Sequence, residues 1–208
     1  MEKTHDSNPA TVSAQPRLHQ DAPELQPYGT VNHLLPLELE EPVRLEMTER
    51  LHQALPDTIT LRDLYKKSHR QMAGATFCQL HLLFDKHFQE QSELVDAIAE
   101  RIQSLGGVSL AMAPDVAETT RLARPPRGRE EVPVQLSRLL DAHPSIIRGC
   151  RGFASRASRV GDDGTNDLIA ARYCAVMNCR PGSSANNWSM SPLVEAEGNK
   201  GHKSFPRA

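Results

Sequence analysis

The sequence lacks several features that define other protein classes. Aromatic residues make up only 4% of its 208 residues, and no apolar run approaches the roughly 18 residues of a membrane span. None of its four cysteines forms a C-x-x-C pair, and the N-terminus has no apolar targeting core. We therefore expect reduced, incidental thiols in a cytoplasmic protein.

The chain also lacks an excess of charge of either sign. Its 24 Lys and Arg residues nearly balance 26 Asp and Glu residues, which leaves a formal net charge of -2. Such a chain has no general attraction to nucleic acids or anionic membranes. The scarcity of aromatic residues and of strand-forming runs favours helices that pack through aliphatic side chains.

The first 41 residues have the composition of a disordered tail. They contain five prolines and show little periodicity, so we predict a disordered, acidic segment over residues 1–41. DNA binding through a tail requires clustered positive charge. This segment is therefore a poor candidate for DNA binding. Its acidic residues are Glu2, Asp6, Asp21, Glu24, Glu38, Glu40 and Glu41.

The apolar pattern of the next 130 or so residues is helical. It predicts helices over about 42–72, 76–105 and 133–160, and a fourth that opens near Thr165. Residues 108–132 form a long connection with a short helix near Asp115–Thr120. A crossover of this length is typical of ferritin-like bundles. We predict an all-α, ferritin-like four-helix domain over residues 42–172, with a short extra helix in the crossover.

Five side chains form a candidate metal site: His69, His81, Asp85, Asp96 and Glu100. The last four lie on the second helix. At about 100° per residue, Asp85, Asp96 and Glu100 lie about 40°, 60° and 100° around the axis from His81, so all four share one side. Histidine combined with carboxylates suits iron, manganese or zinc. The alternative is a solvated polar face, but this side holds no Lys or Arg and borders the apolar stripe.

One chain cannot bring all five side chains to one ion. Asp96 follows His81 by fifteen residues, which is about 22 Å along a helix, whereas bonds from metal to ligand are near 2 Å. A two-fold axis through the middle of the second helix would place His81 of one copy opposite Asp96 and Glu100 of another. We therefore expect two equivalent intersubunit sites in an isologous dimer.

Two motifs and their separation resemble the signature of the Dps miniferritin family. The first is His69-Arg70-Gln71-Met72-Ala73-Gly74, followed by Phe77, Leu80-His81 and Phe84-Asp85; the second is Val95-Asp96-Ala97-Ile98-Ala99-Glu100-Arg101-Ile102, followed by Leu105-Gly106-Gly107. The resemblance extends from about Val43 to Ile169. It implies subunits that assemble into a hollow dodecamer.

The resemblance also implies the roles of the candidate residues. His69 and His81 match the histidine ligands of the family's ferroxidase site, and Asp96 and Glu100 match carboxylates from the neighbouring subunit. Asp85 matches a nearby acid, and Lys66 a lysine that pairs with the carboxylate at position 96. The implied reaction is oxidation of Fe(II) by hydrogen peroxide or oxygen, with storage of ferric mineral and protection against oxidative stress.

The sequence departs from this family at position 70. Arg70 stands where the family usually has an aromatic residue, commonly tryptophan. A cation beside the metals predicts weaker iron binding or slower oxidation.

The sequence after Ile169 departs more strongly. The fourth helix loses its apolar pattern there, and Pro181-Gly182-Ser183-Ser184 would stop it. Suitable codons for residues 176–186 read in another frame as Asn-Glu-Leu-Gln-Ala-Trp-Phe-Ile-Gly-Glu, which resembles the missing end of the family's last helix. We infer a reading-frame shift near Ala171–Arg172, a truncated fourth helix and an irregular segment over residues 173–208. The coding DNA tests this inference.

The sequence is also compatible with two other functions. One is a DNA-compacting nucleoid protein without significant ferroxidase activity; another is a family member that no longer assembles. The single Glu-x-x-His motif, Glu49 to His52, is interpreted as a surface pair, because di-iron bundles use two such motifs in one subunit. The remaining histidines receive no role: His5, His19, His33, His87, His143 and His202.

Overall fold

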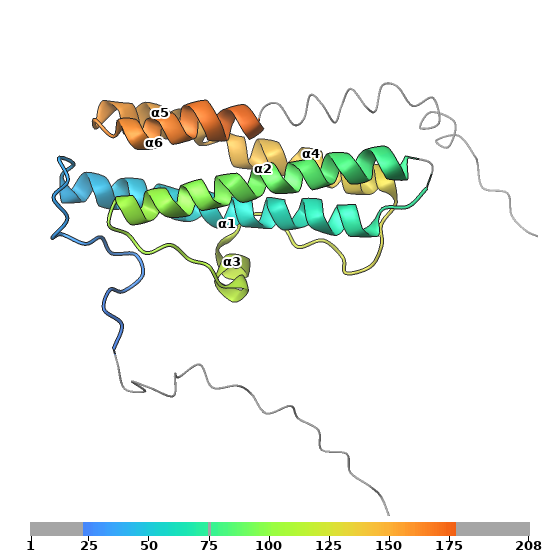
Figure 1. Ribbon diagram of the computed structural model, residues 1–208, viewed down its shortest axis with the longest axis horizontal. Coiled ribbons are helices and arrows are strands. Elements are labelled where there is room, and N and C mark those ends of the chain that lie inside the picture. Colours follow the sequence, from blue (N-terminus) through green and yellow to red (C-terminus); the bar gives the residue numbers. More distant parts are fainter. Residues whose placement is uncertain (1–22, 75, 178–208) are drawn as a thin grey trace, which may run out of the picture.

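The computed structural model describes residues 23–74 and 76–177, which form helices and loops with no strand among them (Figure 1). The all-α prediction is confirmed. None of the described helices is long and apolar enough to cross a membrane. The helices are α1 (Glu41–Gln71), α2 (Phe77–Ser104), α3 (Ala113–Thr119), α4 (Val132–Ile147), α5 (Cys150–Arg159), α6 (Asp163–Asp167) and the π-helix η1 (Leu168–Tyr173).

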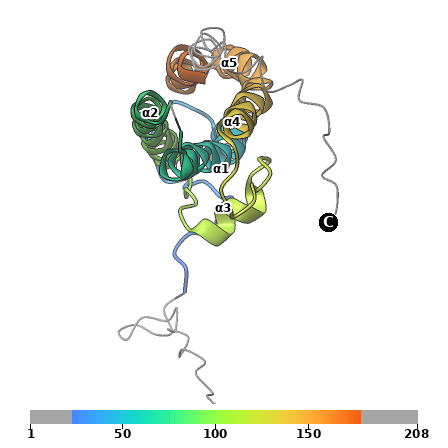
Figure 2. The same ribbon diagram turned by 90° about the vertical axis from the view of Figure 1, so that its right-hand side faces the viewer.

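Seen end-on, the helices form a four-membered bundle (Figure 2). α1 and α2 are two members, α4 continues into α5 as the third, and α6 continues into η1 as the fourth. The long connection between α2 and α4 carries α3, which packs against α1 outside the bundle. The predicted ferritin-like bundle with an extra helix in the crossover is therefore confirmed.

The third member of the bundle is broken where the sequence weakens it. α4 contains Pro144, whose nitrogen has no proton to donate, and Gly149 directly precedes α5. Residues 148–149 separate the two helices. α5 nevertheless remains part of the bundle and buries Phe153, Ala154 and Ala157 in the common core.

The fourth member begins with a side-chain cap and continues to the end of the described chain. Asp162 accepts a hydrogen bond from the backbone nitrogen of Thr165 at 2.9 Å, which satisfies a free donor at the start of α6. Arg101 of α2 donates to the same carboxylate and so ties the end of α2 to this cap. η1 is followed by one more helical turn, over residues 174–177.

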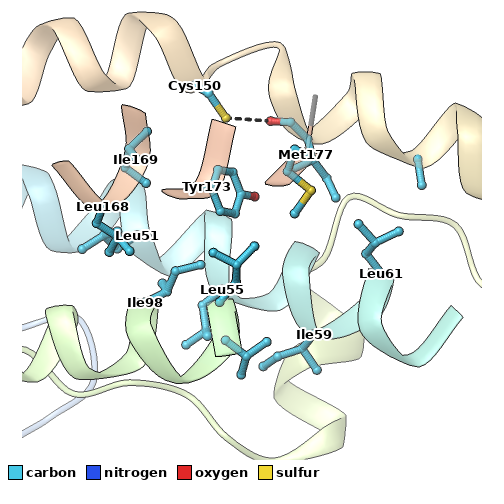
Figure 3. Packing of buried hydrophobic residues seen from close by; sticks show 14 of the residues in the cluster. Leu51, Leu55, Ile59, Leu61, Ile98, Cys150, Leu168, Ile169, Tyr173 and Met177 are labelled. Atoms are coloured by element: carbon cyan, nitrogen blue, oxygen red, sulfur yellow. Dashed lines mark hydrogen bonds between the residues drawn. The ribbon is translucent and has the colours of Figure 1, made fainter. Parts of the chain in front are cut away.

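The core reaches beyond the predicted domain boundary at residue 172. Tyr173 and Met177 are buried, and they lie over the aliphatic layer that includes Leu55 and Ile98 (Figure 3). The Tyr173 hydroxyl is 3.3 Å from that of Thr58 on α1. The predicted stop at Pro181 and most of the predicted 173–208 segment lie outside the described residues.

At the other end, residues 23–40 of the predicted tail pack against the bundle. Asn32 donates its backbone N–H to the carbonyl oxygen of Gly106 at 2.7 Å, and the buried Arg44 guanidinium donates to the carbonyl oxygens of Asn32 and Leu105. Gly106 has φ +87°, and a Cβ there would approach Leu35 to 2.9 Å. Glycine is therefore required at this junction. Residues 1–22 lie outside the described chain.

The interpretation of Glu49 and His52 as a surface pair is wrong for His52. Its side chain is buried against the N-terminal segment, where its ring stacks on that of Tyr28 at 4.5 Å. His52 Nε2 donates to the carbonyl oxygen of Val108 at 3.0 Å. The loop after α2 and the N-terminal segment cover this face of α1, and the helical pattern of α1 alone does not reveal such coverage.

An ion pair between the buried Asp57 and the half-exposed Arg121 fixes the crossover to α1. Asp57 is only 1% exposed, and its carboxylate accepts hydrogen bonds from the Arg121 guanidinium, the Arg121 backbone nitrogen and the Thr120 hydroxyl. Gln53 donates to the same group. These contacts hold the chain directly after α3 against the middle of α1.

Candidate metal centre

His69 and His81 meet at the end of the bundle where α1 passes into α2. His69 lies in the last turn of α1, and His81 lies in the second turn of α2. A short loop with Gly74 at φ +110° reverses the chain between them. The two rings stack with their centroids 3.6 Å apart and an interplanar angle of 26°.

Each ring is oriented by the backbone of the other residue. His69 Nδ1 is 3.1 Å from the carbonyl oxygen of His81, and His81 Nδ1 is 3.2 Å from the carbonyl oxygen of His69. A carbonyl oxygen only accepts, so each Nδ1 carries a proton. In the neutral rings both Nε2 atoms therefore keep a lone pair. This is the arrangement that metal-binding histidines use, with the second nitrogen held by a hydrogen bond.

Asp85 lies next to the histidine pair and is already engaged by a cation. Its Oδ1 is 2.7 Å from Lys66 Nζ and 3.9 Å from His69 Nδ1. The hydrogen bond from Lys66, with help from the nearby positive charges, lowers the pKa of the Asp85 carboxyl. The Lys66 ammonium also lies 4.5 Å from the centre of the Phe88 ring. Within one chain, Lys66 pairs with Asp85, and not with the position-96 carboxylate that the family resemblance implies.

The other two candidate ligands lie farther along α2. α2 is continuous from Phe77 to Ser104, so the expected helical angles hold, and Asp96 and Glu100 are exposed on the side that carries His81. About 22 Å of helix separates Asp96 from His81. Among residues 23–74 and 76–177, no three His, Cys, Asp or Glu side chains converge on a common point. A single chain thus holds the candidate ligands in two separate groups.

Arg70 and Phe77 flank the histidine end of this surface. Arg70 is exposed at the end of α1, and the half-exposed Phe77 ring lies 4.9 Å from the ring of His81. The stacked histidines therefore have an apolar neighbour on one side and open surface nearby.

Comparison with known proteins agrees with this architecture. The family profile described as a ferritin-like domain matches residues 48–173. "DNA protection during starvation protein 1" of Deinococcus radiodurans is 31% identical over 181 residues, which cover 86% of this chain and 83% of that protein. The chain belongs to the Dps family of ferritin-like proteins.

Two further proteins are similar to the chain. An "Uncharacterized protein in bpoA2 5'region" of Kitasatospora aureofaciens is 50% identical over 151 residues, covering 73% of this chain and all of that protein. The structure titled "DpsC from Streptomyces coelicolor" superimposes with a TM-score of 0.79 at 47% identity, covering 83% of this chain and 99% of that one. The Dps fold predicted from the two sequence motifs is confirmed.

The sequence did not reveal every feature of this Dps subunit. It placed the ligand candidates on their helices, but it gave no sign of the reciprocal contacts between the histidine rings and the backbone. It also missed a cluster of buried side chains with polar atoms in the bundle interior, formed by Tyr65, His87 and His143. Only their regular positions in the buried stripes of α1, α2 and α4 could have indicated them.

Proposed function

We propose that this Dps protein oxidises Fe(II) at sites shared between two copies of the chain and stores the ferric product inside a hollow oligomer. The observation that carries the proposal is the separation of the ligands on α2. His69 and His81 hold two free Nε2 atoms at one end, and the carboxylates of Asp96 and Glu100 stand on the same side about 22 Å away.

A second copy turned end-for-end completes both half-sites. An isologous dimer with its two-fold axis near the middle of α2 brings His69 and His81 of one protomer to Asp96 and Glu100 of its partner, twice. Each site then has two imidazoles and two carboxylates, with Asp85 beside the histidines. The family resemblance extends this dimer to a dodecamer, in which the ferric mineral occupies the central cavity.

The two imidazoles and two carboxylates suit iron, which is the substrate and changes its charge from Fe(II) to Fe(III) in the reaction. Neutral imidazoles bind Fe(II) with moderate strength, which permits loading and release. The carboxylates stabilise the product Fe(III) more than Fe(II), because their negative charge interacts more strongly with the higher positive charge. The site therefore favours oxidation. When two Fe(II) ions each supply one electron to hydrogen peroxide, both oxygen atoms end in water and no hydroxyl radical is released.

Lys66 and Arg70 set the charge around the proposed site. Lys66 holds Asp85 in a hydrogen-bonded ion pair on the α1–α2 surface, so Asp85 must exchange this partner before it binds a second iron. Arg70 adds an exposed cation one residue after His69. Both positive charges oppose the arrival of Fe(II) and compensate the negative charge that the partner's carboxylates bring.

Compaction of DNA is the second candidate function, and the name of the Deinococcus radiodurans relative favours testing it. The formal net charge of -2 and the acidic first 41 residues weigh against binding through phosphate contacts. A mobility shift at low salt measures this directly. If the protein retards DNA but does not oxidise Fe(II), DNA compaction is favoured over iron oxidation.

The proposed function is tested by mixing anaerobic Fe(II) with peroxide or oxygen and then sizing the same sample. We expect protein-dependent oxidation, a soluble iron core and a particle of about twelve subunits. The double variants His69→Ala/His81→Ala and Asp96→Ala/Glu100→Ala should each lose the fast oxidation, whereas the exposed controls His33→Ala and Glu118→Ala should keep it. Oxidation that survives in both double variants would contradict the proposed site. Monomers or aggregates in the wild type would indicate a family member that no longer assembles.

A further inference from the structure

Two cysteines lie next to each other between the third and fourth members of the bundle. Cys150 is the first residue of α5, and Cys174 directly follows η1. Cys150 is 4% exposed, and the partly buried Cys174 packs against the same apolar cluster. Each thiol affects the pKa of the other through a hydrogen bond between them. The two sulfur atoms are therefore direct neighbours, which their separation along the sequence did not indicate.

Packing holds both thiols in place. Cys150 Sγ is 3.6 Å from the carbonyl oxygen of Ile146, one turn earlier. Tyr173 and Met177, which are 2% and 0% exposed, anchor the helical turn that carries Cys174 in the core. Figure 3 shows Cys150 beside the segment that carries these two side chains. A disulfide forms only between cysteines whose backbones lie close together, and this packing keeps the two segments together.

The two thiols differ in their reactivity. Burial raises the pKa of the Cys150 thiol to about 12, so this group keeps its proton at neutral pH. Burial also raises the pKa of Cys174, but the hydrogen bond with Cys150 and the positive charge of Arg151 oppose that rise. The thiolate is the form of cysteine that attacks an oxidant. Cys174, which is also the more exposed of the two, therefore reacts first and Cys150 second.

We propose that Cys150 and Cys174 form a disulfide within one subunit when it meets hydrogen peroxide, and that this bond fastens the end of the fourth bundle member to α5. The pair is a modification site that needs no metal, so the inference does not rest on the proposed oxidation of Fe(II). Peroxide is the oxidant, and the two thiols supply both electrons.

The reaction takes place in two steps. The Cys174 thiolate attacks one peroxide oxygen, the S–O bond forms as the O–O bond breaks, and the leaving hydroxide takes up a proton to become water. Cys174 is then a sulfenic acid. The Cys150 sulfur attacks the Cys174 sulfur, the S–O bond breaks, and the hydroxide that leaves takes the proton of Cys150 as a second water. One peroxide is thus reduced to two waters, and two thiols are oxidised to one disulfide.

The disulfide should stabilise a short part of the bundle. Within the described chain, the fourth member runs from Asp163 only to residue 177, whereas α1 has 31 residues. A cross-link lowers the conformational entropy of the unfolded chain and so raises the free energy of unfolding. Oxidation therefore strengthens the attachment of the fourth member under the conditions in which peroxide is present.

The test uses the folded full-length chain with Cys78→Ala and Cys179→Ala, which leaves only the two proposed thiols. The protein is freed of iron with a chelator and treated with hydrogen peroxide. We expect both thiols to disappear together, the intact chain to lose the mass of two hydrogens, and no covalent dimer on a non-reducing gel. The thermal midpoint should rise by several degrees, and a reducing agent should restore both the thiols and the original midpoint.

Single serine variants in this background separate the bond from simple packing. With Cys150→Ser, peroxide should leave a sulfenic acid at Cys174 that dimedone traps. With Cys174→Ser, Cys150 should react roughly tenfold more slowly. Neither variant should gain stability on oxidation. Peptide mapping of the wild type gives an answer without substitutions, with the exposed Cys78 of α2 as the reference thiol. Intact thiols once Cys78 is fully oxidised, sulfinic acid in place of the disulfide, or an unchanged midpoint after the bond forms overturns the inference.

Discussion

The imidazole rings of His69 and His81 stack 3.6 Å apart although they belong to different helices and lie twelve residues apart in the chain. Each Nδ1 contacts the backbone carbonyl oxygen of the other residue. The tight loop between α1 and α2 therefore holds the two candidate ligands in place within one chain. Such pre-organisation reduces the conformational entropy that binding would otherwise cost.

Removal of the Lys66 charge should strengthen metal binding. Lys66 Nζ is 2.7 Å from Asp85, so Lys66→Met removes a positive charge from the edge of the site and frees a carboxylate. We expect Zn²⁺, used as a redox-inert probe in calorimetry, to bind about tenfold more tightly, which corresponds to about 1.4 kcal/mol. Lys67→Met, next to it on α1 but paired with Glu130, is the control. Weaker binding by Lys66→Met would show that the lysine instead organises the site.

Replacement of Arg70 by tryptophan should improve the reaction with iron. The exposed guanidinium lies one residue after His69, where it repels the incoming cation. Arg70→Trp should lower the Fe(II) concentration at half-maximal rate several-fold, as measured by stopped-flow oxidation. Arg148→Trp, an exposed arginine beyond α4, tests whether any loss of surface charge has this effect. Unchanged kinetics in Arg70→Trp refute the idea.

The Asp57–Arg121 pair should contribute strongly to the stability of the subunit. Asp57 is 1% exposed, and the guanidinium is its cationic partner. Arg121→Met removes the half-exposed cationic partner of a buried carboxylate that keeps its other hydrogen bonds. This change costs about 1 to 2 kcal/mol, and the midpoint of thermal unfolding, followed by circular dichroism, should shift downward by a few degrees. The double variant Asp57→Asn/Arg121→Met should recover much of the loss. A single variant as stable as wild type would contradict the role of this pair.

His52 should make the N-terminal junction sensitive to acid. Burial lowers its pKa below the ordinary 6.5, although the carbonyl of Val108 and the charge of Glu49 oppose the shift. The unfolded chain therefore takes up a proton more readily than the folded chain once the pH falls below about 6.5, and stability declines from there down through the folded pKa. Above pH 6.5 both states are neutral at this position and the effect vanishes.

The measurement compares thermal midpoints of wild type and His52→Gln between pH 7.5 and about 5. Glutamine keeps an amide donor for the Val108 carbonyl but does not titrate. The difference between the two proteins should change in favour of the variant as the pH falls. A difference that is constant across this range would show that protonation of His52 does not affect folding.

The sequence predicted the fold well because its signals are local. The apolar periodicity predicted α1 and α2, and the long segment after residue 107 predicted the crossover with its short helix; these elements were confirmed. The single helix expected over residues 133–160 is instead divided into α4 and α5, close to Pro144 and Gly149. The burial of His52 was missed, because it depends on a loop more than fifty residues away in the chain.

In the candidate site, too, the sequence predicted the local features and missed the contacts between helices. Helical spacing placed His81, Asp85, Asp96 and Glu100 on one side of α2, and the loop brought His69 to His81. Helical spacing does not predict the hydrogen bond between Lys66 and Asp85, or the one between Tyr65 and His143 across the bundle. Those contacts depend on the packing of α1 against α2 and α4, which the pattern of a single helix does not encode.

The most direct test of the shared site is complementation between inactive subunits. His69→Ala/His81→Ala and Asp96→Ala/Glu100→Ala chains are each expected to be inactive when assembled alone. When equal amounts are unfolded together and reassembled, half of the dimers should be mixed, and each mixed dimer contains one complete site and one that lacks all four ligands. We expect recovery of about one quarter of the wild-type rate of Fe(II) oxidation. No recovery in verified mixed oligomers would mean that two chains do not build each site.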